Sequence, residues 1–471
     1  MADQPKTRTK RGESLKPEFV SRLRTQARSA SHLSDRLIER RAFESVVWGM
    51  PAVNTDLMLQ EMLTKTKGKV NQVLYWSRPA DWNNQTLTPN PDSIYFMAFF
   101  DTKDVGPIVI DIPPADTGSF AGNIVNVWQT PLEDAGPEGA DKGQGGKFLI
   151  LPPGYAESPP AGYIALPSTT YTGYALLRSN LKSYADADIA AAVDYGKRVE
   201  VYPLSKSASP PATKFTDAMG ILFDSTIPYD LRFFEALDRV VQYEPWLDRD
   251  RVMIDQLRSI GIEKGREFAP DATTLELLEL AADEAKAWLA MKYDGGPPPF
   301  WPGSHWGNPV YPEFAQATQS GYADVNSYPV DRRGVMCTFA FVGVKRLGAA
   351  QFYLISLRDT DGHDLDGGRT YTLTVPRDAP VKQSWSATVY DRETHALIRE
   401  MPRASRSSHT ASLNDDGSVD IYFGPIAPAG REANWIPTAP GARFEVMFRL
   451  YGPEKPFFDK KWRLPDITEV K

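Results

Sequence analysis

The sequence has 471 residues, and its 53 Lys and Arg against 60 Asp and Glu give a net charge of −7. Hydrophobic residues make up 42% and charged residues 24%, which is ordinary for folded proteins and excludes collagen-like, coiled-coil and wholly disordered chains. The length predicts two or three domains, 34 Gly and 39 Pro favour a loop-rich β protein, and one Cys with five His excludes most thiol and imidazole chemistry.

The first 31 residues are polar and basic and are expected to form a flexible tail. They contain no apolar segment typical of a secretion signal, and no run of 18 apolar residues that could span a membrane occurs in the chain. We therefore expect a cytoplasmic protein without a membrane partner. The acidic net charge argues against a nucleic-acid partner, because the basic residues cluster only in this tail.

An N-terminal β domain with a leading helix is expected over residues 32–205. Apolar residues recur at helical spacing from Leu33, and Gly49 with Pro51 predicts the end of that helix. The pattern then changes to a period of two, with Gly- and Pro-rich joints that favour antiparallel strands in a sandwich or barrel. The strands are predicted over 94–101, 107–112, 123–129, 147–151, 163–166 and 171–178.

Residues 206–345 are expected to form a helical connector. Helices are predicted over 229–245 and 273–293, the second opened by a T-x-x-E capping box of Thr273 and Glu276. The stretch 294–314 is rich in Pro, Gly and Trp, so we expect an ordered loop there.

A second β domain is expected over residues 346–471. Strand patterns return with Asp361-Gly362 and Asp416-Gly417 as hairpin turns. The predicted fold class is thus mainly β with a helical connector, in two jelly-roll or β-sandwich-like domains. The aromatic segment PFFDKKWRLP near the C-terminus suggests an arm that packs on a neighbouring copy, so we expect a homo-oligomer.

Two groups of motifs resemble a known two-domain family. TPNPDSIYFMAFFD and WQTPLEDAGPEGADKGQGGKFLILPPGY are similar to domain of unknown function 1254. DGHDLDGGRTYTLTVPRDAPVKQSWSATVYDRETHALI, NDDGSVDIYFGP and FRLYGPEKPFFDKKWRLP are similar to its usual partner, domain of unknown function 1214. The likeness covers roughly residues 40–290 and 345–468. It implies two jelly-roll-like domains and a tendency to oligomerise, but it supplies no reaction.

The PNPDSIY segment carries the first candidate site. Asp92 is a candidate acid or base and Tyr95 a candidate proton or hydrogen-bond donor, with Asn90 as a substrate contact at the mouth of the N-terminal domain. The structural alternative is an Asx-type turn in which Asn90 and Asp92 bond backbone amides.

Other candidates lie on neighbouring segments of the N-terminal half. Arg178 ends a predicted strand and could clamp a carboxylate, although a buried structural ion pair is the alternative. Trp128 is a candidate hydrophobic wall. Glu44 is a possible second catalytic carboxylate, and Trp48 lies four residues later on the same side of the helix.

The loop motif PGSHWGN offers His305 as a candidate acid or base and Trp306 as a candidate substrate contact. No G-x-S-x-G motif supports a serine hydrolase, and no C-x-x-C, H-x-H or H-E-x-x-H motif supports a zinc site. The acidic turn around Asp361 reads as a hairpin rather than a calcium loop. We therefore expect neither a metal nor another cofactor, and solvent-facing positions for the remaining histidines, His395 among them.

The first functional hypothesis is a cofactor-independent enzyme, a hydrolase or lyase, acting on a small organic molecule. The alternative is a non-catalytic ligand-binding or self-assembling protein, because β-sandwiches serve both purposes. An enclosed pocket where a carboxylate, Tyr and Arg converge would favour the enzyme.

Overall fold

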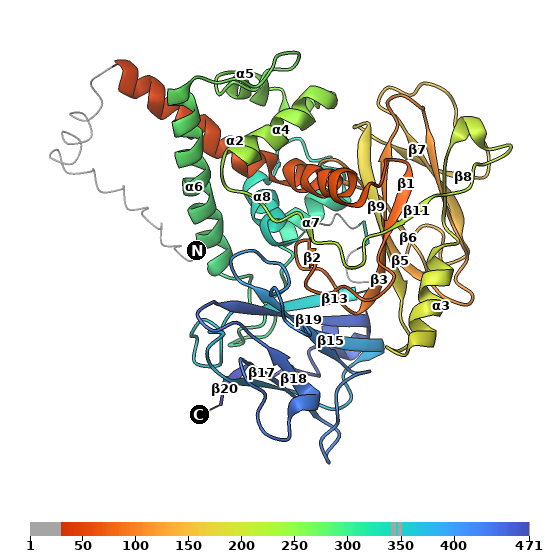
Figure 1. Ribbon diagram of the computed structural model, residues 1–471, viewed down its shortest axis with the longest axis vertical. Coiled ribbons are helices and arrows are strands. Elements are labelled where there is room, and N and C mark those ends of the chain that lie inside the picture. The colour runs from red at the N-terminus through yellow and green to blue at the C-terminus, as the bar shows by residue number, and fades with distance from the viewer. Residues whose placement is uncertain (1–29, 341–344, 347–350, 471) are drawn as a thin grey trace, which may run out of the picture.

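The computed structural model describes residues 30–340, 345–346 and 351–470, so the expected flexible tail lies almost wholly outside the described residues. Within them the chain forms an N-terminal β domain, a layer of helices and a C-terminal β domain (Figure 1). The mainly β, two-domain fold class with a helical connector is confirmed. The finer jelly-roll topology stays a prediction.

The N-terminal domain packs a six-stranded sheet, in the order β11-β1-β3-β9-β5-β6, against a four-stranded sheet, β10-β4-β7-β8. Each of the six predicted strands is present with small shifts at its ends. Helix α3 (Asp186–Gly196) packs on this domain. The strands are β1 Gln72–Tyr75, β2 Asn84–Gln85, β3 Ser93–Asp101, β4 Ile108–Ile112, β5 Phe120–Asn126, β6 Pro131–Ala135, β7 Gly146–Leu151, β8 Tyr163–Pro167, β9 Thr172–Asn180, β10 Glu200–Pro203, β11 Phe215–Asp217 and β12 Phe223–Asp224.

Alternation along the strands decides which side chains of the large sheet face the sandwich core. In β3, Phe96 and Ala98 belong to the core between the two sheets, whereas Tyr95 and Met97 lie on the outer face. Arg178 of β9 is directly opposite Tyr95 in the antiparallel register and shares that outer face. The predicted site residues therefore face away from the sandwich interior, not into its mouth.

Among the described residues, four strand pairs are parallel and so differ from the expected antiparallel pattern, two of them being β2 with β12 and β17 (Val419–Gly424) with β18 (Trp435–Pro437). Strand β8 pairs with β7 in parallel, which the irregular, Pro-rich connection over 152–162 makes possible. Strand β11 pairs in parallel with β1, so the chain returns to the N-terminal sheet beyond the expected domain boundary at residue 205. Local sequence patterns do not predict which strands pair when the strands are distant in the sequence.

The helical layer is built around α2 (Ala30–Glu61), which contacts α4, α6 and α8. The leading helix thus belongs to this layer rather than to the N-terminal β domain. The predicted capping box is wrong, because Asp271 caps α6 by accepting a hydrogen bond from the Thr274 amide. The other helices are α4 Leu231–Tyr243, α5 Met253–Arg258, α6 Ala272–Asp294, α7 Pro312–Gln319 and α8 Val330–Phe339.

Helix α2 continues through Pro51, where the sequence predicted its end. Proline has no N–H, so the carbonyl of Val47, one turn earlier, loses its helical partner. Gly334 of α8 packs against this carbonyl, and a Cβ at that position would lie only 2.8 Å from the oxygen. Close packing by α8 and the burial of residues 45–56 hold the helix together across the proline.

The C-terminal domain is also a sandwich of two sheets, in the orders β13-β19-β15-β16 and β18-β17-β14-β20. Its outer face follows the same alternation: Phe448 and Leu450 enter the core, whereas Met447 and Arg449 lie on the opposite face. The elements are β13 Gln351–Ser356, β14 Tyr371–Val375, β15 Val381–Asp391, β16 Ser405–Ser407, β17 Val419–Gly424, β18 Trp435–Pro437, β19 Phe444–Pro453, α9 Lys455–Phe458 and β20 Thr468–Glu469.

The aromatic C-terminal segment packs within its own domain. Phe457 is fully buried, and its ring stacks on Phe300 with 4.8 Å between the ring centres. Trp462 joins the same cluster. The segment that suggested an oligomer therefore has its contacts inside one chain, and oligomer formation stays a prediction. No helix in the described ranges is long and apolar enough to cross a membrane.

Candidate functional site

A cavity of about 240 Å³ lies where the outer faces of the two β domains meet. The large N-terminal sheet contributes one wall and strands β13 and β19 of the C-terminal domain the other, while α7 and α8 close it from the helical layer. Figure 1 shows this junction between the N-terminal β domain, the central helices and the blue C-terminal domain. Its polar lining residues include Tyr95, Asn123, Arg178, Tyr353, Arg449 and Tyr451.

The two walls present the same pair of residue types at the same relative position. Tyr95 of β3 is opposite Arg178 of β9 in the N-terminal sheet. Tyr353 of β13 is opposite Arg449 of β19 in the C-terminal sheet. Because directly opposite residues share one face of a sheet, each wall offers a guanidinium beside a phenol.

Arg178 is buried, with 7% of its surface exposed, and is only partly bonded. One terminal nitrogen, Nη1, donates to Asn123 Oδ1 at 3.3 Å, while Nε has no hydrogen-bond partner among the described residues. Burial by itself opposes the charged form, but the phenols of Tyr353 and Tyr95 outweigh it and hold the pKa of Arg178 above its usual range. The side chain is therefore a buried cation with donor capacity to spare.

Arg449 is more firmly held. Its Nη1 donates to Thr388 Oγ1 at 3.0 Å, and its Nη2 donates to the Tyr390 hydroxyl at 2.6 Å and to the Thr88 carbonyl at 3.0 Å. Its Nε, like that of Arg178, has no partner among the described residues. These bonds attach the C-terminal sheet to the N-terminal domain.

Neither of the two buried arginines, Arg178 and Arg449, forms an ion pair with a carboxylate in the part of the chain that the structure describes, whereas the more exposed Arg346 at the cavity pairs with Glu133. Asp134 does line the cavity, but its oxygens accept hydrogen bonds from Asn123 Nδ2 at 3.0 Å and from the amides of Lys345 and Arg346. Arg178 therefore has no carboxylate counter-ion among the described residues, whereas Arg449 interacts electrostatically with the buried Asp92 behind the lining.

Asn90 orients two of the phenols. Its backbone N–H donates to the Tyr95 hydroxyl at 2.8 Å, and its Nδ2 donates to the Tyr451 hydroxyl, also at 2.8 Å. Each phenol oxygen thus receives a hydrogen bond and keeps its own O–H to donate. Together with the arginines, these phenols make the cavity rich in donors, which is the character of an oxyanion site.

Asp92 lies behind the cavity and is not part of its lining. Its Oδ1 accepts hydrogen bonds from the hydroxyls of Tyr184 and of Ser405, the latter at 2.9 Å, while Oδ2 has no partner among the described residues. Burial raises the pKa of Asp92. The Asx-type turn also exists in part, because Asn90 Oδ1 accepts the Asp92 amide at 3.0 Å. This carboxyl group joins the two β domains and has no direct access to a ligand.

The other N-terminal candidates do not line the cavity: Glu44 and Trp48 belong to α2, and Trp128 lies between β5 and β6. Trp48 and Trp128 pack together with 4.7 Å between ring centres, and Trp48 Nε1 donates to Asp250 Oδ1 at 3.0 Å. Glu44 is exposed on α2, and partial burial together with the charge of Asp331 raises its pKa. Trp48 and Trp128 are part of the buried core, and Glu44 lies on the surface.

His305 and Trp306 lie in the C-terminal domain, and neither lines the cavity. The His305 amide donates to Asp466 Oδ1 at 2.9 Å. Trp306 is fully buried, and its Nε1 donates to the Pro465 carbonyl at 2.8 Å. Three of the site residues predicted from the sequence, Asn90, Tyr95 and Arg178, line the cavity, and the other predicted site residues lie elsewhere in the fold.

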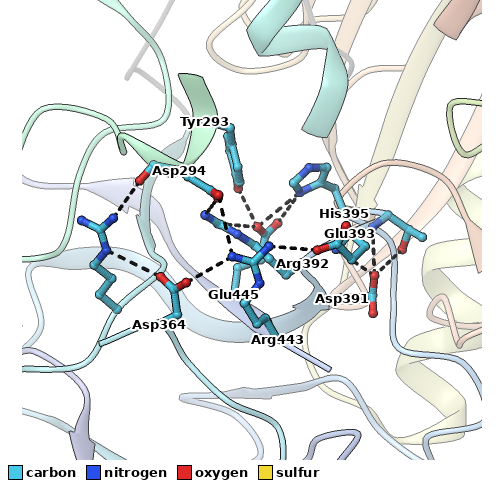
Figure 2. A network of polar contacts seen from close by, with 11 residues as sticks. Tyr293, Asp294, Asp364, Asp391, Arg392, Glu393, His395, Arg443 and Glu445 are labelled. Carbon is cyan, nitrogen blue, oxygen red and sulfur yellow. Dashed lines mark hydrogen bonds and ion pairs between the residues drawn. The ribbon is translucent and has the colours of Figure 1, made fainter. Parts of the chain in front are cut away.

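A second buried polar cluster joins the end of α6 to the C-terminal sheet (Figure 2). Glu445 is fully buried and accepts hydrogen bonds from Tyr293 at 2.7 Å and Arg392 at 3.2 Å, while His395 Nδ1 lies 3.1 Å away. Burial by itself raises the pKa of Glu445, but His395 and Arg392 hold it below its ordinary value. Arg392 also pairs with Asp294. The expectation of a solvent-facing His395 is wrong, because its side chain is only 12% exposed.

The C-terminal wall of the cavity was not predicted from the sequence. Arg449 and Tyr451 stand two apart in the strand FEVMFRLYGP, where a charged residue interrupts an apolar pattern, and this interruption was the available signal. Tyr353 carried no comparable signal. Within the described ranges, no group of three His, Cys, Asp or Glu side chains could hold a metal ion.

Both halves of the chain match known families. Residues 70–203 match the family described as "Protein of unknown function (DUF1254)", and residues 350–455 match "Protein of unknown function (DUF1214)". The chain belongs to the family that joins these two domains. The two matches together contain the strands that carry Tyr95, Arg178, Tyr353 and Arg449, so each domain of the family supplies one wall of the cavity.

Solved structures with a similar fold include the VPA0106 protein from Vibrio parahaemolyticus, which is 17% identical with a TM-score of 0.58 over 92% of this chain and 100% of that chain. A putative uncharacterized protein from Burkholderia cenocepacia is 13% identical with a TM-score of 0.42, over 92% of this chain and 94% of that chain. No curated protein matches the sequence. The Vibrio structure shares the fold, and its similarity carries no further inference.

Proposed function

We propose that this protein binds a small organic anion in the cavity between its two β domains. The observation that supports the proposal is Arg178, a buried guanidinium with an unpaired Nε and no carboxylate partner among the described residues. An uncompensated buried charge is costly to a fold, so its presence at a cavity suggests that the counter-ion comes from a ligand.

The donors around Arg178 suit a carboxylate or a similar oxyanion. Guanidinium groups bind such groups through two parallel N–H bonds, and the phenols of Tyr95 and Tyr451 offer further O–H donors. Arg449 supplies a second positive charge from the facing wall.

Calorimetric titration with benzoate and with benzamide, its neutral isostere, tests the proposal. We expect benzoate to bind at least tenfold more tightly, because only the carboxylate gains charge-assisted hydrogen bonds. Arg178→Met should remove most of this difference, since a hydrogen bond to a charged group is worth about 1.5–3 kcal/mol.

The matched control is Arg377→Met, which removes a guanidinium that is 73% exposed and far from the cavity lining. This variant should bind benzoate as the wild type does. Equal affinity for benzoate and benzamide, or no binding of either, would refute the proposed function.

Catalysis at the same site is a second candidate, as the cofactor-independent hydrolase or lyase expected from the sequence. The observation that favours it is the Tyr95 O–H beside Arg178, because a phenol and a cation together can stabilise an oxyanion that develops on a substrate carbonyl. The position of Asp92 behind the lining does not support its acid–base role.

A panel of esters, amides and lactones tests this candidate. We expect Tyr95→Phe to lower kcat at least tenfold with little change in KM, because the lost donor acts in the transition state. If no compound of the panel is turned over by the wild type, the protein is better described as a binding protein.

A further inference from the structure

The cavity has an apolar wall directly beside its arginines. Val310, Phe314 of α7, Met336 of α8 and Met447 of β19 all line the cavity, and they pack together in one hydrophobic cluster. Met447 lies two residues before Arg449 on the same face of β19. The apolar wall therefore begins next to the buried guanidinium.

The lining on the other side of Arg449 is polar. Tyr451 follows two residues later on the same strand, and the exposed side chains of Lys382 and Gln383 line the cavity beyond it. The cavity thus changes in character along β19, from apolar at Met447, through the cation at Arg449, to polar at its exposed edge.

We infer that the ligand is a monocarboxylic acid with an apolar body, which lies with its carboxylate at Arg178 and Arg449 and its body against the wall of Val310, Phe314, Met336 and Met447. This inference rests on the proposed function and adds the chemical class of the ligand. The four wall side chains carry no hydrogen-bonding N–H or O–H, so a second carboxylate placed there would lose its water without compensation. Flexible methionine side chains suit an apolar group of variable shape.

A series of three acids separates the charge from the apolar body. Acetate has the carboxylate alone, hexanoate adds an apolar chain, and adipate has the same six-carbon chain with a second carboxylate at its far end. Each buried methylene strengthens binding by about fourfold. In calorimetric titrations we expect hexanoate to bind at least tenfold more tightly than acetate and at least tenfold more tightly than adipate.

Val310→Lys places a cation in the apolar wall at a half-buried position outside regular structure. We expect this variant to lose the preference for hexanoate over adipate, while its affinity for acetate stays within threefold of the wild type. The matched control is Val325→Lys, which adds the same charge at a residue that is 95% exposed and should keep the wild-type order of affinities. Thermal melting shows whether each variant is folded, and the wild-type series decides the question if Val310→Lys is not.

The titrations distinguish a failure of the inference about the apolar body from a failure of the proposed anion binding. If acetate or adipate binds as tightly as hexanoate, the inference about the apolar body is overturned while the anion-binding function stands. If benzoate does not bind, or binds no more tightly than benzamide, the proposed function falls and the inference falls with it.

Discussion

Two buried polar clusters among the described residues differ in whether their arginines form ion pairs with carboxylates. In the cluster around Glu445, the arginine Arg392 has two carboxylate partners, and His395 adds a further contact (Figure 2). In the cavity, neither Arg178 nor Arg449 forms an ion pair among the described residues, although Arg449 interacts electrostatically with Asp92. Both clusters lie between layers of the same fold, so burial alone does not explain the difference. A closed network serves stability, and the open donor positions of the cavity are those that we propose to bind a ligand.

Replacing the central carboxylate of the closed cluster is expected to have the largest effect on stability. Glu445→Gln leaves Arg392 with one carboxylate instead of two and removes the charge opposite His395. Breaking a buried ion pair in this way costs about 3–5 kcal/mol. Urea unfolding should show this loss, and Arg178→Met, measured alongside, should cost less than about 1 kcal/mol because it removes a charge that has no partner.

The pH dependence sharpens the same comparison. Glu445 has a pKa below its ordinary value of 4.5, so its contribution is complete above that pH and is lost as the pH falls through the lower, folded-state pKa. The deficit of Glu445→Gln should therefore shrink in acid. A larger loss of stability from Arg178→Met than from Glu445→Gln would contradict the distinction between the two clusters.

Asp92 gives the smallest and most specific test, because it is a buried carboxyl only two residues from Asn90 of the cavity. Its pKa is raised above the ordinary value of 3.8, so its favourable contribution is present below that pH and is lost as the pH rises through the folded-state pKa. Asp92→Asn keeps an oxygen for Tyr184 and Ser405 but cannot ionise.

We therefore expect the melting temperature of Asp92→Asn to rise relative to the wild type as the pH increases from 4 to 8, by an amount equivalent to about 1 kcal/mol. Calorimetric scans across this range provide the measurement. A difference that is constant with pH would mean that Asp92 has the same pKa in the folded and the unfolded protein.

The strands of the N-terminal sandwich were predictable because short, mostly apolar runs such as β3 and β9, bounded by Gly- and Pro-rich joints, are a local signal. The outward direction of Tyr95 and Arg178 was not predictable from the sequence. The alternation of side chains along a strand shows which residues share a face, but it does not show which face meets the second sheet. Pro51 misled the helix prediction for a related reason, because the support that α8 gives to α2 comes from residues nearly 300 positions away.

Half of the candidate site was accessible from sequence and half was not. Asn90, Tyr95 and Arg178 attracted attention through their residue types in one recognisable segment and one strand. Arg449 and Tyr353 belong to the other domain, and only the packing of two sheets brings them to the same cavity. Trp48, Trp128 and Trp306 were predicted as ligand contacts but are buried in the core. Large aromatic residues are more often core residues than pocket residues.

The segment from Thr88 to Asp92 has a consequence for the order of folding. Its Thr88 amide donates to the His395 carbonyl, its Pro89 carbonyl accepts the Tyr390 hydroxyl, and Asn90 and Asp92 bond Tyr451 and Ser405. These partners are separated from the segment by about 300 residues or more, as the Pro89–Tyr390 interval of 301 shows. During synthesis the N-terminal sandwich can close on its own core first. The proposed anion site is then completed only when the last strands of the chain have been synthesised.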